Sequence, residues 1–475
     1  MRRLILALGL ASLAAIAAAQ ETPLHKKVTA KYDRLPLANV LKDLGERAGV
    51  RFVWTEELPE RFDPVTYEAQ EQEAGRVATQ ILRPRGMRLE KMDGNAATVV
   101  KLDPLDEFKV KREESFEFAE RPNVSREGDK TTITFATKGW CDVTVAIEDP
   151  QGKIIRHLAS GVLGQYAPEP LAWDSKKQTL IWDGKNDQGT YVDDKDSLTV
   201  RVSLGLKPRF ERSLFWDPKR RLGSWEEGTI LVNTPTPLIQ ARPEGVYVFE
   251  GRGVDRLQLF DHQGRYVRTI YPFAAEKLQQ VEGLDWHTFP QDGLKFPLRA
   301  GFAQATFLTS GSSRIRPGGA HGGGPSTFGS AARSMYDANF WVEGAEWLYG
   351  GVGFCGKNVI CSCWNCRFAF DDFARSFVPE VDRCRAAVLD SNGNLILRVG
   401  KYGNVEDGKP LVAEGGPANP RSVGGDEVAL FYAPYLATHT DRRLFIADPG
   451  NGRIVSVKLD YHATQKVDLK DIPEP

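Results

Sequence analysis

The segment SFVPEVDRCRAAVLDSNGNLILRVG, residues 376–400, carries the pattern on which the fold assignment depends. A short apolar run is followed by a polar turn, an arginine, a second apolar run, an Asp-x-x-Gly turn and a third apolar run. Most of this order recurs in VYVFEGRGVDRLQLFDHQGRYVRTI (246–270) and LFIADPGNGRIVSVKLD (444–460). Short strands separated by polar turns, repeated along the chain, predict a repeated antiparallel β structure.

The arginine is the most regular position of this repeat. Arg256 and Arg385 each stand five residues before the aspartate of the next turn, which is Asp261 or Asp390. They are 129 residues apart (385 − 256), which is three steps of 43 and falls within the ~40–50 residue period of propeller blades. We expect these arginines, and Arg453 with them, to tie a turn to a neighbouring blade; ligand contact is the alternative.

The segments VDRCRAAVLDSNGNLILRVG (381–400) and DPGNGRIVSVKLD (448–460) resemble the blades of NHL-repeat β-propellers. The resemblance implies that residues 225–470 form an NHL-like β-propeller, and it says little about function. Two glycine-rich stretches interrupt the repeats, at 310–332 and 401–427, and we expect both to be long loop insertions. The number of blades stays open at five or six.

The N-terminus has the form of a secretory signal. Arg2 and Arg3 precede an apolar run of about 16 residues, and Ala17 and Ala19 supply the small residues of a cleavage site. The run is short of the ~20 residues that span a bilayer. We therefore predict a signal peptide over 1–19, a periplasmic or secreted mature protein, and no membrane insertion after cleavage.

The composition favours several domains built mainly from β structure. The chain has 475 residues, of which 41% are hydrophobic, and this is too much for one core of ordinary size. Its 45 glycines and 28 prolines favour turn-rich β structure over helical bundles. Lysine plus arginine (62) nearly balances aspartate plus glutamate (63), so we do not expect nucleic acid as a partner.

Residues 27–102 predict a small α/β module. In LPLANVLKDLGERAGVRFVW (35–54), apolar residues recur at helical spacing from Leu37 to Ala48, bounded by Pro36 and Gly49. A second helix is expected around 77–82, followed by a hairpin that turns at Asp93-Gly94. These segments resemble the short N-terminal domain of secretins and TonB-dependent receptors. That resemblance implies a periplasmic protein-contact domain without chemistry of its own.

Residues 115–208 predict an immunoglobulin-like β-sandwich. The segment TTITFATKGWCDVTVAIEDPQGKIIRHLASG (131–161) alternates apolar and polar residues around a turn at Pro150-Gln151-Gly152. It resembles, together with WDGKNDQG (182–189), the immunoglobulin-like domain associated with flagellar hook-capping proteins. The residues that carry this resemblance are Val145, Ile147, Asp149, Gly152, Ile155, Arg156, Leu158, Trp182, Asp183, Gly184, Asp187 and Gly189. The resemblance implies a spacer, and we expect Asp183, Asn186 and Asp187 to stabilise a turn rather than to bind calcium.

Five of the six cysteines lie between 355 and 384. They are Cys355, Cys361, Cys363, Cys366 and Cys384, and the sixth is Cys141. Covalent haem is not expected, because arginine and not histidine follows the Cys-x-x-Cys pair. A redox dithiol is not expected either, because the context lacks a helix N-terminus. One or two disulfides among these five cysteines fit an exported protein best. A tetrahedral soft-metal site made by the first four remains an alternative, as do thiols that are not fully paired.

No catalytic motif stands out. The seven histidines show no paired metal-binding spacing, and no nucleophile elbow is present. Asp371 and Asp372 are neighbours on an expected strand, so their side chains point to opposite faces and cannot share a proton. We therefore expect an exported, non-catalytic binding or scaffold protein without a cofactor, whose propeller face binds an envelope protein or glycan. The alternative is a propeller-type lyase or lactone hydrolase with a divalent metal in its central channel.

Overall fold

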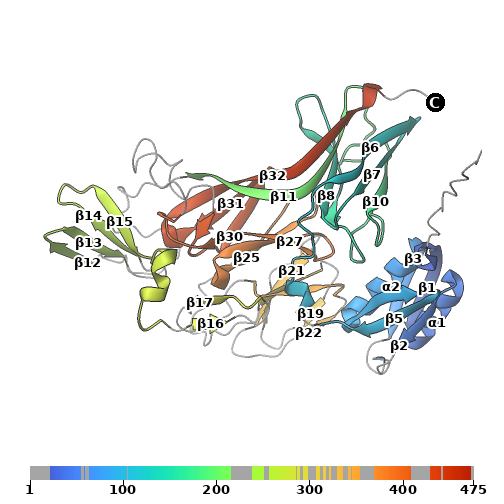
Figure 1. Cartoon of the computed structure of the whole chain (residues 1–475), viewed down its shortest axis with the longest axis horizontal. Helices are drawn as coiled ribbons and strands as arrows, with labels where there is room; N and C mark the ends of the chain where they lie inside the picture. The colour runs from blue at the N-terminus through green and yellow to red at the C-terminus, as the bar shows by residue number, and fades with distance from the viewer. Residues whose placement is uncertain are drawn as a thin grey trace, which may run out of the picture. The chain divides into compact units, whose positions relative to one another are not determined.

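The protein is described from a computed structural model (Figure 1). The residues that it describes are 22–54, 58, 64–103, 105–214, 238–250, 256–284, 286–288, 292–297, 306–310, 314–316, 320–322, 329–334, 341–343, 345–352, 368–407, 428–439 and 442–471. The predicted signal peptide at 1–19 lies outside them. The chain divides into two compact units, 1–101 and 102–475. The structure is mainly β and contains several sheets.

In its described part, the smaller unit contains two α-helices, two 3₁₀ helices and two small sheets. Its elements are the 3₁₀ helix η1 Pro23–His25, β1 Lys27–Leu35, α1 Leu37–Ala48, β2 Arg51–Trp54, β3 Val65–Glu73, α2 Ala74–Leu82, the 3₁₀ helix η2 Arg83–Arg85, β4 Met87–Asp93 and β5 Ala96–Lys101. β1 pairs antiparallel with β3, and β5 lies between β2 and β4. Both predicted helices are confirmed, as is the hairpin turn at Gly94, whose φ is 58°. α1 ends where expected, since Gly49 has a φ of 80° and its N–H donates to Gly45 O.

The larger unit begins with two sheets that enclose one core. The first has the order β10–β7–β6, with β6 Phe118–Glu127, β7 Lys130–Thr137 and β10 Lys177–Trp182. The facing strands are β8 Asp142–Glu148, β9 Ile154–Val162, residues 199–204 of β11 and residues 461–468 of β32. Val143, Val145, Phe135 and Trp182 are fully buried between them, and Leu469 from the C-terminus joins the same core. We call these two layers the paired sheets.

Two long strands run out of the paired sheets into the rest of the unit. β11 (Thr199–Leu214) and β32 (Arg453–Asp468) are antiparallel partners from Thr199↔Asp468 to Leu214↔Ile454 (Figure 1). They belong to one six-stranded sheet with the order β30–β31–β32–β11–β8–β9, in which β30 is Tyr435–His439 and β31 is Arg443–Asp448. The boundary predicted at residue 208 therefore falls inside a continuous strand.

Three sheets correspond to the three repeated sequence segments, and we call them the repeat sheets. The first is β12 Leu238–Arg242, β13 Gly245–Glu250, β14 Arg256–Phe260 and β15 Tyr266–Tyr271. The second is β24 Ala369–Phe370, β25 Ser376–Glu380, β26 Arg385–Leu389 and β27 Leu395–Val399. The third is β30, β31 and the first half of β32, with residues 207–214 of β11 as its fourth strand.

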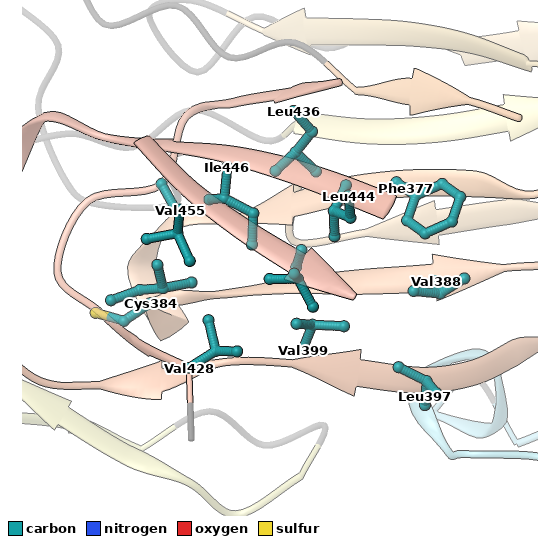
Figure 2. Packing of buried hydrophobic residues seen from close by; sticks show 14 of the residues in the cluster. Phe377, Cys384, Val388, Leu397, Val399, Val428, Leu436, Leu444, Ile446 and Val455 are labelled. Carbon is teal, nitrogen blue, oxygen red and sulfur yellow. The ribbon is translucent and has the colours of Figure 1, made fainter. Parts of the chain in front are cut away.

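The second repeat sheet is buried on both faces. Every residue of β25 and β26 is buried. On one face, Phe377, Val388 and Val399 pack against Leu444 and other side chains of the third repeat sheet (Figure 2). On the other face, Ala387, Leu389 and Leu395 form a separate cluster with Trp347 and Tyr349. Since a fully buried large apolar side chain contributes roughly 1.5–3 kcal/mol, this double burial fixes the sheet between its neighbours.

One hairpin turn recurs through the larger unit. Its first residue is an aspartate or asparagine whose Oδ1 accepts the backbone N–H groups of the second and fourth residues that follow. The turns begin at Asp149, Asn186, Asp261, Asp371 and Asp390. The residue three places on has a left-handed backbone in each, with φ between 60° and 79°. The predicted turn at Pro150-Gln151-Gly152 is confirmed as one of them.

The remaining elements of the larger unit are short. They are β16 Trp286–Thr288, β17 Lys295–Pro297, β18 Thr306–Ser310, β19 Arg314–Arg316, β20 Ala320–Gly322, β21 Gly329–Ser334, β22 Trp341–Glu343, β23 Leu348–Gly350, β28 Lys401–Tyr402, β29 Ala429–Leu430 and the 3₁₀ helices η3 Asp106–Phe108, η4 Ala275–Gln280, η5 Val381–Arg383, η7 Pro449–Asn451 and η8 Leu469–Asp471. Strands β19, β20 and part of β21 fall within 310–332, where we predicted a loop. Of the second predicted loop, 401–427, residues 408–427 lie outside the described part. No helix among the described residues is long and apolar enough to cross a membrane.

Candidate functional site: acid–arginine clusters at the repeat-sheet turns

The turn between the second and third strands of each repeat sheet is bounded by an acid and an arginine. The chain leaves the second strand at an acidic residue and enters the third strand at an arginine directly opposite it. The paired positions are Glu250↔Arg256, Glu380↔Arg385 and Asp448↔Arg453. Antiparallel pairing places opposite side chains on the same face about 4.5–5.5 Å apart. In the second and third repeat sheets this brings Glu380 to Arg385 and Asp448 to Arg453 as ion pairs.

Glu380 is the centre of the largest of these clusters. Its side chain is fully buried, and its Oε2 accepts hydrogen bonds from Nε of Arg385 and from Nε of Arg398, the latter at 3.1 Å. Its Oε1 accepts the hydroxyl of Tyr349 at 2.5 Å. Burial opposes ionisation of Glu380, but Arg385, Arg398 and Arg383 outweigh it and lower the pKa of the carboxyl. Glu380 is therefore held as an ionised anchor for the arginines.

Asp292 extends this cluster beyond the repeat sheet. Its Oδ2 lies 2.5 Å from Nη2 of Arg385 and 3.5 Å from Nε of Arg383. Burial acts against ionisation of Asp292, but the hydrogen bond from Arg385 and the positive charges prevail and lower its pKa. Arg385 thus joins its own sheet to the segment before β17.

The chemistry of this cluster is that of fixed charge pairs. Burial and the adjacent Glu380 raise the pKa of Tyr349 well above its ordinary value, so its hydroxyl stays protonated and donates. Both carboxyls carry lowered pKa values and accept hydrogen bonds from arginines. General acid–base catalysis near neutral pH needs a group that exchanges its proton there. The cluster is instead arranged to hold strands and a connecting segment together.

Asp448 organises the corresponding turn of the third repeat sheet. Its Oδ1 accepts the backbone N–H groups of Phe431 and Tyr432, at 3.2 Å and 3.0 Å. Its Oδ2 accepts Nδ2 of Asn451 at 2.8 Å and Nε of Arg453 at 3.3 Å. Arg453 also donates to the backbone carbonyl of residue 429. The motif therefore ties the turn to the incoming segment before β30.

Arg256 lies beside that same turn. Its guanidinium passes over Gly452, where a Cβ atom would stand 2.3 Å from Nη1. Gly452 also has a φ of 64°, a left-handed conformation that favours glycine. Arg256 of the first repeat sheet therefore lies against the turn of the third.

Of the six cysteines, the structure describes Cys141 and Cys384. Cys355, Cys361, Cys363 and Cys366 lie outside the described residues, so the predicted disulfides or metal site among them stay predictions. Cys384, which we also named as a disulfide candidate, is buried, and its thiol donates to Phe431 O at 3.3 Å. Neither Cys141 nor Cys384 forms a disulfide. The left-handed backbone of Cys384, with φ 51°, turns its side chain into the core between two repeat sheets (Figure 2).

Several polar residues that we considered as calcium ligands or as a proton-sharing pair form hydrogen bonds within turns. Asn186 uses Oδ1 to hold its own turn, and Asp183 Oδ1 accepts Lys185 N at 3.2 Å. Asp371 and Asp372 were expected on a strand, but they lie in the turn that follows β24, because Asp371 Oδ1 accepts the N–H groups of that turn. Asp371 is buried against Arg375, whereas Asp372 is exposed. Within the described residues, no three histidine, cysteine, aspartate or glutamate side chains gather in a metal-binding arrangement.

Sequence reasoning singled out Arg385 and Arg453 but missed Arg383, Arg398 and the acids of the clusters. Glu380 and Asp448 stand five residues before Arg385 and Arg453, and that spacing was available as a signal. Tyr349 and Asp292 left no such signal, because they reach the cluster from other segments of the chain.

Comparisons with known proteins leave the family open. No family model matches the chain, and a search of curated proteins found no match. Among solved structures, a match was found to a structural genomics protein of unknown function from Bacteroides thetaiotaomicron VPI-5482. Its sequence identity is 9% and the TM-score is 0.21, over 73% of this chain and 100% of that one. A similarity at this level carries no argument about fold or function.

Proposed function

We propose that this protein is an exported, non-catalytic binding or scaffold protein. In this proposal the repeat sheets belong to an NHL-like β-propeller, and the paired sheets are an immunoglobulin-like spacer. The N-terminal unit is a secretin-like contact module, and the partner is an envelope protein or a glycan. No cofactor is part of the proposal.

The observation that carries the proposal is the pairing of β11 with β32. β11 precedes all three repeat sheets in the sequence, yet residues 207–214 form the fourth strand of the last one. A ring of sheets avoids open edges when its first strand completes its last sheet. The double burial of the second repeat sheet also suits a blade that lies between two others.

The contacts of the paired sheets indicate which end of the repeat sheets would bind. The turns 371–375 and 390–394 join first to second and third to fourth strands, and both contact the paired sheets through His157 and Val162. In an antiparallel sheet the turn between second and third strands lies at the opposite end. We therefore place the binding face at the end of the second repeat sheet that carries the turn at 381–384, where Asp382 is partly exposed and its neighbours are buried.

The ion pairs of the turn clusters support a scaffold more than an enzyme. At Glu380 and Asp292 the pKa values are lowered and the carboxyls are bound by arginines, which suits a rigid binding face. The charge balance of the whole chain supports a protein or glycan over nucleic acid as the partner.

A binding experiment with matched variants tests the proposal. The protein lacking residues 1–19 is immobilised, and its retention of purified envelope proteins and of peptidoglycan fragments is measured. Asp382→Arg changes the proposed face, and Gln263→Arg changes an exposed turn at the other end. We expect Asp382→Arg to weaken binding about tenfold and Gln263→Arg to leave it unchanged. Equal effects of both variants would contradict the proposed face. One divalent ion per chain, bound with substrate turnover, would favour the propeller lyase or lactone hydrolase instead.

A further inference from the structure

His157 lies at the junction between the paired sheets and the second repeat sheet. It belongs to β9, its side chain is 10% exposed, and it stands between the turn at 183–189 and the turn at 371–375. The ring packs edge-on against Phe373, with centroids 4.5 Å apart. Two parts of the larger unit therefore meet at one imidazole.

Asp187 fixes which nitrogen of this imidazole carries its first proton. One carboxylate oxygen accepts the backbone N–H of His157 at 2.9 Å, and the other lies 2.6 Å from Nδ1. An ionised carboxylate only accepts hydrogen bonds, so Nδ1 is the protonated nitrogen in the neutral ring. Nε2 is then the nitrogen that gains or loses a proton.

Nε2 faces a second carboxylate, which comes from the other side of the junction. Oδ2 of Asp372 lies 4.0 Å from Nε2, and its side chain is 73% exposed. When the ring is neutral, the lone pair of Nε2 faces this negative charge. When Nε2 takes up a proton, the same geometry becomes a charge-assisted ion pair across the junction.

The other charged groups near the ring do not replace Asp372 as the partner of Nε2. Arg156 approaches Asp187 rather than the imidazole, with Nη1 3.7 Å from Oδ1. In the opposite turn, Asp371 and Arg375 form a buried pair with an N–O distance of 2.6 Å and so offset each other. In the turn at 183–189, Asp183 and Lys185 also pair with one another. Asp372 is thus the charge that responds to the state of Nε2.

We propose that His157 is a proton-operated clasp between the paired sheets and the second repeat sheet. Acidification puts a proton on Nε2, forms the ion pair with Asp372 and holds the turn at 371–375 more tightly to β9. Deprotonation releases that turn without breaking the hydrogen bonds to Asp187. The clasp couples the junction to the protonation state of one imidazole. It does not depend on the identity of any partner.

Amide hydrogen exchange in the full chain tests the clasp. Protection of residues 372–376 is measured at about pH 8 and about pH 5.5, with correction for the intrinsic exchange rate. In the unaltered protein we expect protection to rise about two- to fivefold on acidification, the size of an exposed ion pair. Asp372→Asn should abolish that rise. Asp183→Asn, which removes a carboxylate that pairs with Lys185 in the turn at 183–189, should leave it intact.

Three outcomes would overturn the proposal. They are equal protection at the two pH values in the unaltered protein, a rise that persists in Asp372→Asn, and a rise that is lost in Asp183→Asn. Because Asp372 is exposed, its variant should fold normally, and His157→Gln supplies a second test that should also lose the rise.

Discussion

The carboxylate of Asp390 accepts a hydrogen bond from the backbone N–H of Val162 at 3.0 Å, although the two residues stand 228 positions apart. Asp390 begins the turn between β26 and β27, and its Oδ1 also accepts the N–H groups of Asn392 and Asn394. One buried carboxylate therefore holds its own turn and fastens the second repeat sheet to the paired sheets.

Asp390→Ala should destabilise the larger unit by about 2–4 kcal/mol, because it leaves buried N–H groups of two segments without an acceptor. Asp261→Ala is the matched control, since Asp261 holds the same turn in the first repeat sheet but is more exposed. We expect the control to cost about 1 kcal/mol. Urea unfolding followed by tryptophan fluorescence measures both, and similar losses would show that the contact with Val162 contributes little.

Glu148 is expected to be the most sensitive buried charge in the six-stranded sheet. Its fully buried carboxylate pairs with Nε of Arg201 at 2.6 Å, Nζ of Lys466 at 2.6 Å and Nη2 of Arg442 at 3.1 Å. Glu148→Gln leaves the buried Arg201 without its counter-ion and should cost about 3–5 kcal/mol. Lys466→Met removes a partner that is half exposed and should cost under about 1 kcal/mol. Thermal unfolding compares the two, and equal losses would contradict the assignment.

Glu211 should make stability fall in acid. The hydrogen bonds from Arg443 lower the pKa of its carboxyl to about 2, with help from Ser456. A folded-state pKa below the unfolded value contributes stability that is present above about pH 4.5 and is lost between about pH 4.5 and pH 2. Glu211→Gln should therefore lose stability at neutral pH and show a shallower decline of Tm in that interval. A decline as steep as in the unaltered protein would contradict this.

Glu406 should make stability fall as the pH rises, which is opposite to the effect of Glu211. Burial raises the pKa of this carboxyl, which accepts hydrogen bonds from Tyr266 OH and Thr269 N. The folded protein then holds a proton that the unfolded chain releases, so this stability is complete below about pH 4.5 and falls as pH rises. Glu406→Gln, which cannot ionise, should raise Tm relative to the unaltered protein more at about pH 7.5 than at about pH 4. Glu276→Gln, an exposed change, should show no such difference.

Thiol labelling can distinguish Cys141 and Cys384, which the structure describes, from the other four cysteines. Cys141 and Cys384 are buried, and burial raises the pKa of the Cys141 thiol to about 12. Neither should react with a thiol reagent in the folded protein, and both should react after unfolding. The disulfides predicted among Cys355, Cys361, Cys363 and Cys366 should appear as a loss of about two mass units per bridge in the oxidised intact protein. Fast labelling of all six thiols in the folded state would contradict both expectations.

The sequence by itself determined the features that depend on neighbours in the chain. Apolar spacing, Pro36 and Gly49 predicted α1, because a helix buries one stripe and needs particular residues at its ends. Period-two alternation and the Asp-x-x-Gly turns predicted the hairpins, because those turns bond to their own backbone. The five-residue spacing from acid to arginine also lies in the sequence, although it was not recognised there as a charge pair.

Tertiary structure alone decided which distant segments pair. Backbone hydrogen bonds are the same whichever strand lies alongside, so nothing in Thr199 or Asp468 marks them as partners. The same reason hid the joining of Glu148 to Lys466 and of His157 to Asp372, since each pair meets only after β32 and the second repeat sheet have docked. Alternation of apolar and polar residues indicates which face of a strand is buried. Which other strand pairs with it depends on packing across the whole unit.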